Sequence, residues 1–291
     1  MKYTFKQFQA QFPDDAACLE AMMKVQFGGT RLTCPGCGVV AVQFHPITNR
    51  RAYACQECGH HIYPCAGTIF HKSSTKLTSW FFAMYLMTST RHGVAAKELQ
   101  RQIGCTYKTA WRMAHELRKL MASADYTGKL SGIVEVDEMF HGPNTHAKTG
   151  TGGKTVVFGA VERGGKIRAG VVPNSTMSTL KGAVRQNIEK GTLVNTDEHR
   201  SYTGLEYMGY DHQSVNHSAE EWVRGIVHTN TIEGHWGLFR RAVRGTHVHV
   251  SQKHLWKYIS EFSYRRNLRD SHFEMFRRLV VSLSLLRLAD A

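Results

Sequence analysis

The stretch IVEVDEMF, residues 133–140, embeds carboxylates in a run of β-branched and aromatic side chains. Such residues favour strands, so the stretch predicts a buried strand. Side chains alternate along a strand, which puts Glu135 and Asp137 on one face and apolar residues such as Val136 on the other. Because burying Asp137 without a partner would be costly, we expect a cationic group beside it. Taken alone, the segment fits an edge strand with solvated acids about equally well.

Two further strands are predicted after this stretch. Residues 155–161 and 166–172 are rich in strand formers and are joined by Glu-Arg-Gly-Gly, a favourable hairpin turn. Together with the first strand they predict an antiparallel meander. A helix predicted for residues 178–189 leads into an apolar strand that ends at Asp197. Open α/β sheets place ligand-binding groups at strand ends beside a helical crossover, so Asp197 is a second candidate site residue.

A helix predicted for residues 227–244 carries the third candidate acid. Its apolar side chains recur at helical spacing on one face, while Asn230, Glu233 and Arg240 fall on another. The apolar face would pack on the sheet, and the polar face would be left for chemistry. Taken alone, Glu233 is better explained as a solvated acid near a helix amino terminus, where the helix dipole stabilises it.

Four of the seven cysteines form two Cys-x-x-Cys pairs, each followed by glycine and separated by seventeen residues. At this spacing four thiolates can surround one Zn²⁺ tetrahedrally, in a closed site that stabilises the fold and takes no part in catalysis. The odd number of cysteines and their close pairing favour metal binding in a reducing compartment over a disulfide framework. Residues 39–44 and 51–54 would form the hairpin of a zinc ribbon. The expected zinc ligands are Cys34, Cys37, Cys55 and Cys58.

Residues 73–120 show helical periodicity interrupted by glycine. A short helix over residues 95–102, a turn at Gly104 and a basic helix over residues 106–121 favour a helix-turn-helix, although units of three helices also serve as connectors. In the last helix the basic residues lie off the apolar stripe, where they could face a DNA groove. The expected DNA-binding residues, from this helix and from the segment after residue 240, are Lys108, Arg112, Arg118, Lys119, Arg241 and Arg244.

The composition is that of a basic globular protein. The formal net charge is +14, the isoelectric point is about 9.6, and the segment from Arg240 onward holds eleven Lys and Arg against four Asp and Glu. Such a charge favours polyanionic partners, with nucleic acid first among them. No stretch is apolar for long enough to span a membrane, and the amino terminus lacks the apolar core of a signal peptide. We therefore expect a cytoplasmic, nucleoid-associated protein.

The order of these features resembles that of the zinc-ribbon DDE transposases of bacterial insertion sequences. The resemblance covers nearly the whole chain and is carried chiefly by EVDE (135–138), NTDE (195–198) and HTNTIEG (228–234). It implies an α/β chain with an RNase H-like catalytic core preceded by a zinc ribbon and a helix-turn-helix-like domain. The implied domains are a helical lead-in (1–30), the zinc ribbon (31–66), the helix-turn-helix-like domain (70–125), the catalytic domain (130–250) and basic carboxy-terminal helices packed on the core (251–291).

The resemblance also implies the catalytic residues and their ions. Asp137, Asp197 and Glu233 would form the acidic triad and hold two Mg²⁺ or Mn²⁺ ions, hard cations that prefer carboxylate oxygens and promote in-line displacement at phosphorus. Members of the group carry either Asn or Glu as the third residue, and this chain has both, Asn230 and Glu233. Arg240 follows Glu233 by two turns, where related enzymes carry a lysine or an arginine.

The implied activity is transposition, in which the chain cleaves the ends of its insertion sequence and the freed 3′-hydroxyl attacks target DNA. The partners would be double-stranded DNA, as terminal inverted repeats and as target, and a further copy of the chain in a homodimer or higher oligomer, because two ends must be held together. Two alternatives remain open. One is a metal-dependent DNA nuclease that cuts without joining, and the other is a non-catalytic zinc-ribbon DNA-binding regulator.

Overall fold

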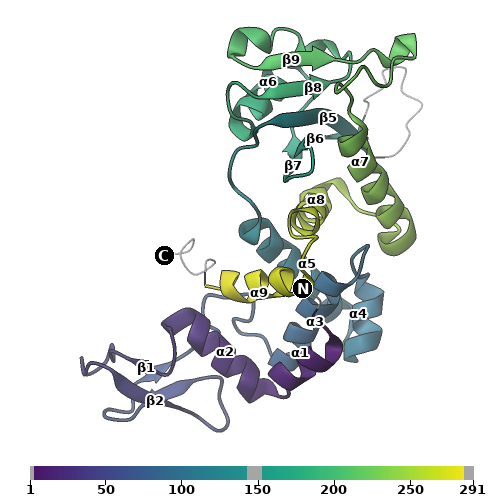
Figure 1. Cartoon of the computed structure of the whole chain (residues 1–291). Coiled ribbons are helices and arrows are strands. Elements are labelled where there is room, and N and C mark those ends of the chain that lie inside the picture. Colours follow the sequence, from purple (N-terminus) through teal and green to yellow (C-terminus); the bar gives the residue numbers. More distant parts are fainter. Residues whose placement is uncertain (1–2, 143–152, 285–291) are drawn as a thin grey trace. The chain divides into compact units, whose positions relative to one another are not determined.

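The computed structural model describes residues 3–142 and 153–284, and the chain divides into two compact units (Figure 1). The first unit combines residues 1–124 with residues 268–291, and the second spans residues 125–267. The chain thus leaves the first unit, forms the second and returns to the first.

The first unit begins with two helices and a small antiparallel sheet. Helices α1 (Phe5–Gln11) and α2 (Asp15–Phe27) are capped by the side chains of Thr4 and Asp14. The sheet has the strand order β1-β2-β3-β4, and its β2–β3 hairpin connects the two Cys-x-x-Cys pairs, as predicted for a zinc ribbon. Its strands are β1 (Arg31–Leu32), β2 (Val42–Pro46), β3 (Tyr53–Cys55) and β4 (His61–Ile62).

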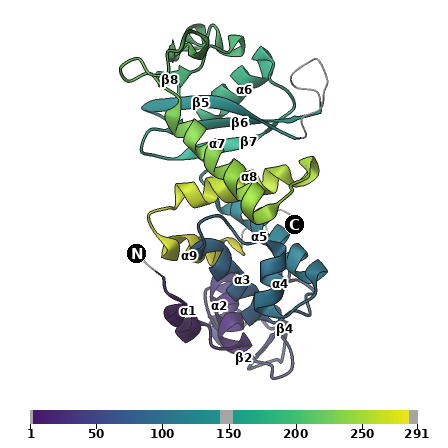
Figure 2. The same ribbon diagram turned by 90° about the vertical axis from the view of Figure 1, so that its right-hand side faces the viewer.

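Further helices complete the described part of the first unit: α3 (Leu77–Ser89), α4 (Ala96–Ile103), α5 (Tyr107–Ala124) and α9 (His272–Ser282) (Figure 2). Gly104 joins α4 to α5 in the left-handed conformation, φ 73°, so the helix, glycine turn and helix lie where the sequence predicted them. Helix α9 packs against α2, α3 and α5, and its Phe276 contacts the rings of Phe8 and Phe12. The sequence prediction placed residues 251–291 together on the catalytic core, whereas α9 lies in the first unit.

The second unit is a five-stranded sheet with the order β7-β6-β5-β8-β9. Strands β5, β6 and β7 form the predicted antiparallel meander, while β8 is parallel to β5 and β9 is parallel to β8. This mixed order, with the first candidate acid on the central strand, is that of an RNase H-like core. The strands are β5 (Ile133–His141), β6 (Thr155–Glu162), β7 (Ile167–Val172), β8 (Leu193–Thr196) and β9 (Asp211–Ser214).

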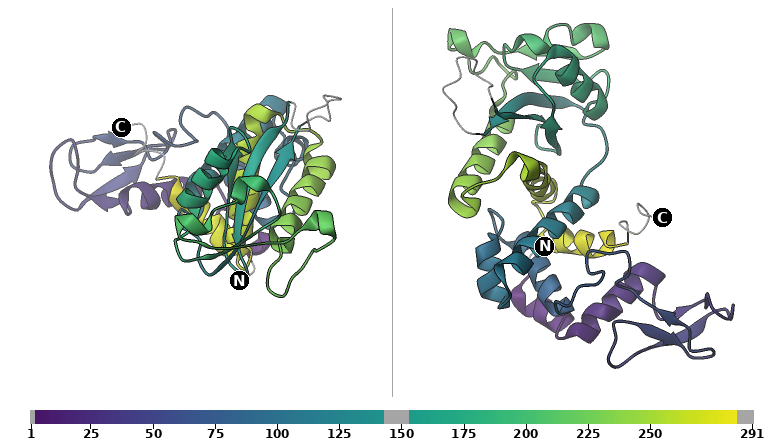
Figure 3. Two further views of the ribbon diagram at one scale, coloured as in Figure 1. Left: turned by 90° about the horizontal axis from the view of Figure 1, so that it is seen from above. Right: turned by 180° about the vertical axis from the view of Figure 1, so that it is seen from behind.

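Helices cover both faces of this sheet (Figure 3). Helix α6 (Met177–Asn187) packs on the face that carries Val134 and Val136, and α7 (Asn230–Ala242) and α8 (Gln252–Asn267) pack on the other. Gly159 of β6, the strand partner of Asp137, allows α7 to approach closely, because a Cβ at this position would collide with the ring of Trp236. The predicted alternation, with Glu135 and Asp137 on the face opposite Val134 and Val136, is confirmed, but helices pack on both faces, whereas only the apolar face was expected to pack.

Candidate active site

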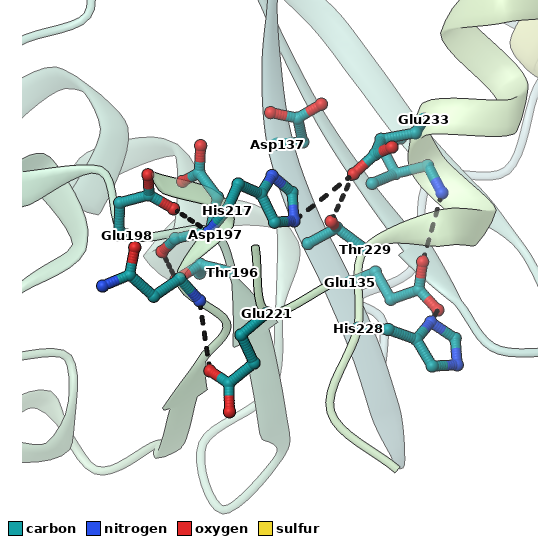
Figure 4. A network of polar contacts seen from close by, with 12 residues as sticks. Glu135, Asp137, Thr196, Asp197, Glu198, His217, Glu221, His228, Thr229 and Glu233 are labelled. Carbon is teal, nitrogen blue, oxygen red and sulfur yellow. Dashed lines mark hydrogen bonds and ion pairs between the residues drawn. The ribbon is translucent and has the colours of Figure 1, made fainter. Parts of the chain in front are cut away.

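Three carboxylates from three elements line one hollow of about 350 Å³ in the second unit. Asp137 lies in the middle of β5, Asp197 directly follows β8, and Glu233 lies in the first turn of α7 (Figure 4). Strands β5 and β8 run parallel with Glu135 opposite Asn195, so the acids two positions further along, Asp137 and Asp197, come to the same end of neighbouring strands. The other residues that line the hollow are His217, Trp236 and Arg240.

The carboxyl group of Asp137 is strongly perturbed. Burial, and after it the carboxylates of Glu138, Asp197 and Glu233, raises its pKa from 3.8 to about 7. The backbone N–H of Glu138, which donates to Asp137 at 2.8 Å, opposes this shift only in part. Clustered carboxylates of this kind destabilise one another until a proton or a cation neutralises them. The hollow therefore favours a cationic ligand.

Local contacts hold the other two acids. The backbone N–H of His199 donates to Asp197 Oδ1 at 3.0 Å, and the hydroxyl of Thr229 donates to Glu233 Oε1 at 2.6 Å. The imidazole of His217 points toward Glu233, with Nε2 4.0 Å from Oε1 (Figure 4). Glu233 is thus turned toward Thr229 and His217 and keeps an exposed side chain that can rotate.

The donor chemistry of the hollow fits hard divalent cations, which prefer carboxylate oxygens. The carboxylate oxygens of the three acids are nevertheless farther apart than the ligand atoms of a formed metal site. Within residues 3–142 and 153–284, only four cysteines form a group of three or more metal-ligand side chains with all ligand atoms within 4.8 Å of one another. The carboxylates would have to rotate toward one another to share ions, and the exposed side chain of Glu233 has the freedom to do so.

Asn230 does not line this hollow, although it lies one helical turn from Glu233. It is the first residue of α7 and is exposed. Of the two candidates for the third site residue, the fold therefore brings Glu233 to Asp137 and Asp197 and leaves Asn230 aside. Arg240 reaches the same hollow as Glu233, as expected from their spacing of two turns.

A fully buried carboxylate, Glu135, attaches α7 to the sheet. It accepts hydrogen bonds from the backbone N–H groups of Thr231 (2.6 Å) and Ile232 (3.2 Å) and from the hydroxyl of Thr231 (2.8 Å). These N–H groups belong to the first turn of α7, where no intrahelical acceptor exists, so Glu135 caps the helix. The guanidinium of Arg163 donates to the same carboxylate at 3.0 and 3.2 Å, and His228 Nδ1 lies 3.2 Å away. The cation was expected beside Asp137, but the structure places Arg163 beside Glu135, two residues earlier on the same strand face, and the charged groups that shift the pKa of Asp137 are carboxylates.

The four paired cysteines converge in the first unit. Sγ of Cys34 lies 3.7 Å from that of Cys58, and Sγ of Cys37 lies 4.0 Å from that of Cys55. A tetrahedron with zinc–sulfur bonds of about 2.3 Å has edges of about 3.8 Å. The four thiols therefore fit one Zn²⁺, as the sequence predicted, and all four coordination positions would be filled by protein.

Two family models match the chain. Residues 129–267 match the ISXO2-like transposase domain, and residues 13–61 match the transposase zinc-ribbon domain. The chain is 30% identical over 261 residues to an uncharacterized protein in transposable element ISH50 of Halobacterium salinarum, in an alignment that covers 81% of this chain and 85% of that protein. The chain belongs to the ISXO2-like transposase family.

Other similarities are weaker. The transposase is 28% identical over 102 residues to an uncharacterized transposase-like protein of Haemophilus influenzae, covering 35% of this chain and 81% of that one. A solved structure of a simian T-cell lymphotropic virus intasome in complex with PP2A regulatory subunit B56 gamma has 13% sequence identity and covers 62% of this chain and 65% of its own, with a TM-score of 0.30. That score is too low to support a structural argument.

Family membership confirms the resemblance predicted from the three acidic stretches and the cysteine pairs. It makes DNA the partner of this ISXO2-like transposase and agrees with the net charge of +14. No helix within the described ranges is both long enough and apolar enough to cross a membrane.

The basic residues predicted to contact DNA differ in accessibility. Lys119 is held by an ion pair with Glu116 at 2.8 Å, which reduces its availability to a phosphate. The exposed members of the predicted set are Lys108, Arg112, Arg241 and Arg244.

The prediction is wrong for Arg118. Arg118 is only 1% exposed, and its guanidinium donates to the carbonyl oxygen of Val94 at 3.5 Å. Helix α5 packs against α3, α4 and α9 and therefore buries more than one narrow stripe. The apolar periodicity of the sequence marks the stripe but gives no measure of how far around the helix the contacts extend.

Sequence reasoning missed two contributions to the site of the transposase. His217 comes from a 3-10 turn between β9 and α7, where no periodicity predicts its position. The sequence pattern assigns Glu138 no role of its own, yet it is buried and accepts a hydrogen bond from the hydroxyl of Tyr202 at 2.7 Å, and burial raises its pKa. Because side chains alternate along a strand, the sequence indicated only that Glu138 would lie on the face opposite Asp137.

Proposed function

We propose that this transposase cleaves DNA at the ends of its insertion sequence and joins the freed 3′-hydroxyl to target DNA at the hollow lined by Asp137, Asp197 and Glu233. The observation that supports the proposal is the convergence of these three carboxylates, from β5, the end of β8 and α7, with Arg240 beside them. Two Mg²⁺ or Mn²⁺ ions held by these carboxylates would supply the positive charge that in-line displacement at phosphorus requires.

The residues of the chain have distinct tasks in this proposal. Asp137 lies between the other two acids, with Asp197 on one side and Glu233 on the other, and these three carboxylates would hold the ions. Arg240 contacts a non-bridging oxygen of the scissile phosphate, because a guanidinium group matches phosphate geometry. Glu135 acts through α7, which it holds so that Glu233 and Arg240 remain beside Asp137.

The first unit supplies recognition of the element ends. One Zn²⁺ on the four cysteines holds the ribbon, and the exposed side chains of Lys108 and Arg112 on α5 contact DNA. At least two copies of the chain act together, because two ends must meet one target site. Light scattering of the purified complex with end DNA tests this stoichiometry, and a complex with one chain would contradict it.

The deciding experiment uses the full chain, Mg²⁺, a plasmid and duplex DNA that carries the inverted repeats flanking the gene. We expect strand cleavage at the repeat ends and a joined plasmid product. Asp137→Asn should bind the repeat and neither cleave nor join. Cleavage by this variant at the wild-type rate would overturn the proposal.

Pre-cut ends with a free 3′-hydroxyl separate transposition from the first alternative. If the wild-type chain cleaves intact ends but never joins pre-cut ends to the plasmid, it is a nuclease. If it binds the repeats and cleaves nothing with either Mg²⁺ or Mn²⁺, the regulator is the better description.

A further inference from the structure

A second hollow, of about 760 Å³, adjoins the acidic one in the second unit. It lies between the end of β5, the turn that follows α7 and the first turn of α8. Arg240 lines both hollows, so the two share a wall. We call the second hollow the basic groove and define it by Lys154, Arg240, Arg244 and Lys253, with His141 and His249 beside them.

The charge of the basic groove is of one sign. Among the described residues that line it, none is Asp or Glu. In the part of the chain that the structure describes, no carboxylate lies within ion-pair distance of Lys154, Arg240, Arg244 or Lys253. Several cations around one concavity repel one another and raise the local concentration of anions. The groove is therefore the chemical opposite of the hollow it adjoins, and an anionic ligand would relieve the repulsion.

The backbone along one wall of the groove is unusual. The segment Val243–His247 forms a π-helical turn at the end of α7, and Val248 follows at φ 64°. A β-branched residue rarely adopts this left-handed region. Val248 is 80% exposed, so burial does not compensate the strain. Both π-turns and strained residues concentrate at functional sites.

A helix terminus also borders the groove. Ser251, Gln252 and Lys253 line the groove at the start of α8, a helix of 16 residues. The amino-terminal end of a helix carries partial positive charge and N–H groups without intrahelical acceptors, both of which favour phosphate oxygens. Side chains and backbone thus present positive charge to the same space.

We propose that the basic groove binds the sugar–phosphate backbone of the single DNA strand that leads to the scissile phosphate. This inference rests on the proposed function and assigns the path of its substrate. A hollow of this volume suits a ligand the size of a few nucleotides, so one strand fits where a duplex does not. Contacts to phosphate through Arg244, Lys253 and Lys154 position the strand without reading its sequence. Arg240, at the shared wall, marks the point where the strand passes from the groove to the acids.

Binding of a single-stranded oligothymidylate to the full chain, without added divalent ions, tests the groove. The variant Arg244→Ala/Lys253→Ala removes two groove cations and leaves Arg240 in place. The matched control is Arg185→Ala/Lys190→Ala, which removes two exposed cations on and just after α6, on the other face of the sheet. The logarithm of the binding constant falls with the logarithm of the salt concentration. For the groove variant this slope should be shallower than that of the wild type by about 1.4, since each phosphate contact to a single strand contributes about 0.7. The control should keep the wild-type slope.

Hydrogen exchange of the wild-type chain provides a second measurement that needs no variant. The oligonucleotide should protect backbone amides of residues 243–253. Equal salt slopes for groove variant and control, or no protection of this segment, would overturn the proposal. Equal protection by inorganic pyrophosphate at the same phosphate concentration would also overturn it, because the groove would then be a site for small free anions.

These measurements are independent of catalysis. Asp137→Asn should bind the oligonucleotide with the wild-type slope even though it cleaves nothing. A wild-type chain that fills the groove but never cleaves element ends would contradict the proposed function alone. A chain that cleaves normally while residues 243–253 stay unprotected would contradict the groove alone.

Discussion

The carboxylate of Glu135 accepts a hydrogen bond from the backbone N–H of Thr231 at 2.6 Å and so joins the central strand to the first turn of α7. Glu135 stands two residues before Asp137, and Thr231 stands two residues before Glu233. One buried contact therefore sets the relative position of two candidate metal ligands that lie almost one hundred residues apart in the chain. Arg240, on the same helix, depends on it as well.

Glu135→Gln should loosen this attachment while preserving side-chain volume. The change leaves Arg163 and His228 without their buried anion, and breaking a buried ion pair typically costs about 3–5 kcal/mol. We expect faster hydrogen exchange over residues 230–242 and a higher Mg²⁺ concentration for half-maximal cleavage. Thr231→Val is the milder comparison, since it removes only the hydroxyl bond to the carboxylate, worth about 1.5–3 kcal/mol. Equal effects of the two variants would show that the charge of Glu135 is unimportant.

Asp137→Asn should stabilise the metal-free fold at alkaline pH. Because the pKa of Asp137 is raised from 3.8 to about 7, the folded chain holds its proton more tightly than the unfolded chain. Its contribution to stability is present below pH 3.8 and is lost as the pH rises through about 7. Asparagine carries no charge at any pH, so the variant should melt at a higher temperature than the wild type at pH 8.

Thermal unfolding at pH 5 and pH 8 measures this effect. The advantage of the variant should shrink at pH 5, where the wild-type carboxyl is largely protonated. Added Mg²⁺ should raise the melting temperature of the wild type and leave the variant unchanged, since a ligand stabilises only the state that binds it. A wild-type protein that melts no lower than Asp137→Asn at pH 8 would contradict the raised pKa.

The choice between Glu233 and Asn230 can be decided by paired substitutions. Glu233→Gln should slow strand cleavage by more than about a hundredfold, because loss of even an outer partner of a metal ligand costs up to that much. Asn230→Ala should cleave within about threefold of the wild type, because Asn230 is exposed and does not line the acidic hollow. Initial rates at saturating Mg²⁺ measure both. The opposite ranking would move the third catalytic position to Asn230.

Local patterns sufficed for the features that depend on neighbours in the chain. The alternation along IVEVDEMF predicted that Glu135 and Asp137 share one face of β5, and the spacing of the cysteine pairs predicted the four thiols that converge. The antiparallel meander followed from two strand-forming runs and a short turn. Each of these predictions uses a period or a spacing that covalent geometry imposes.

The features that could not be predicted depend on which elements pack together. Arg118 looks like a surface residue on a helical wheel, yet it is buried on α5, a helix that packs against α3, α4 and α9. Helix α9 returns to the first unit through contacts of Phe276 with rings near the amino terminus, which no local period encodes. His217 reaches the acids from an irregular segment, so only tertiary structure reveals it.

Removal of zinc should affect recognition of DNA ends and leave the catalytic unit folded. Cys34→Ser deletes one of four ligands of a site that is closed within the first unit, and structural zinc sites contribute about 10–16 kcal/mol of binding free energy to folding. We expect native mass spectrometry to show one zinc per chain in the wild type and none in the variant. Hydrogen exchange should rise over residues 31–66 and stay unchanged over residues 133–141.

Cys105→Ser is the matched control, because that cysteine is partly exposed and lies outside the cluster, and it should retain zinc and end binding. If Cys34→Ser binds element ends as tightly as the control, the ribbon takes no part in recognition, and the exposed cations of α5 become the remaining candidates for that task.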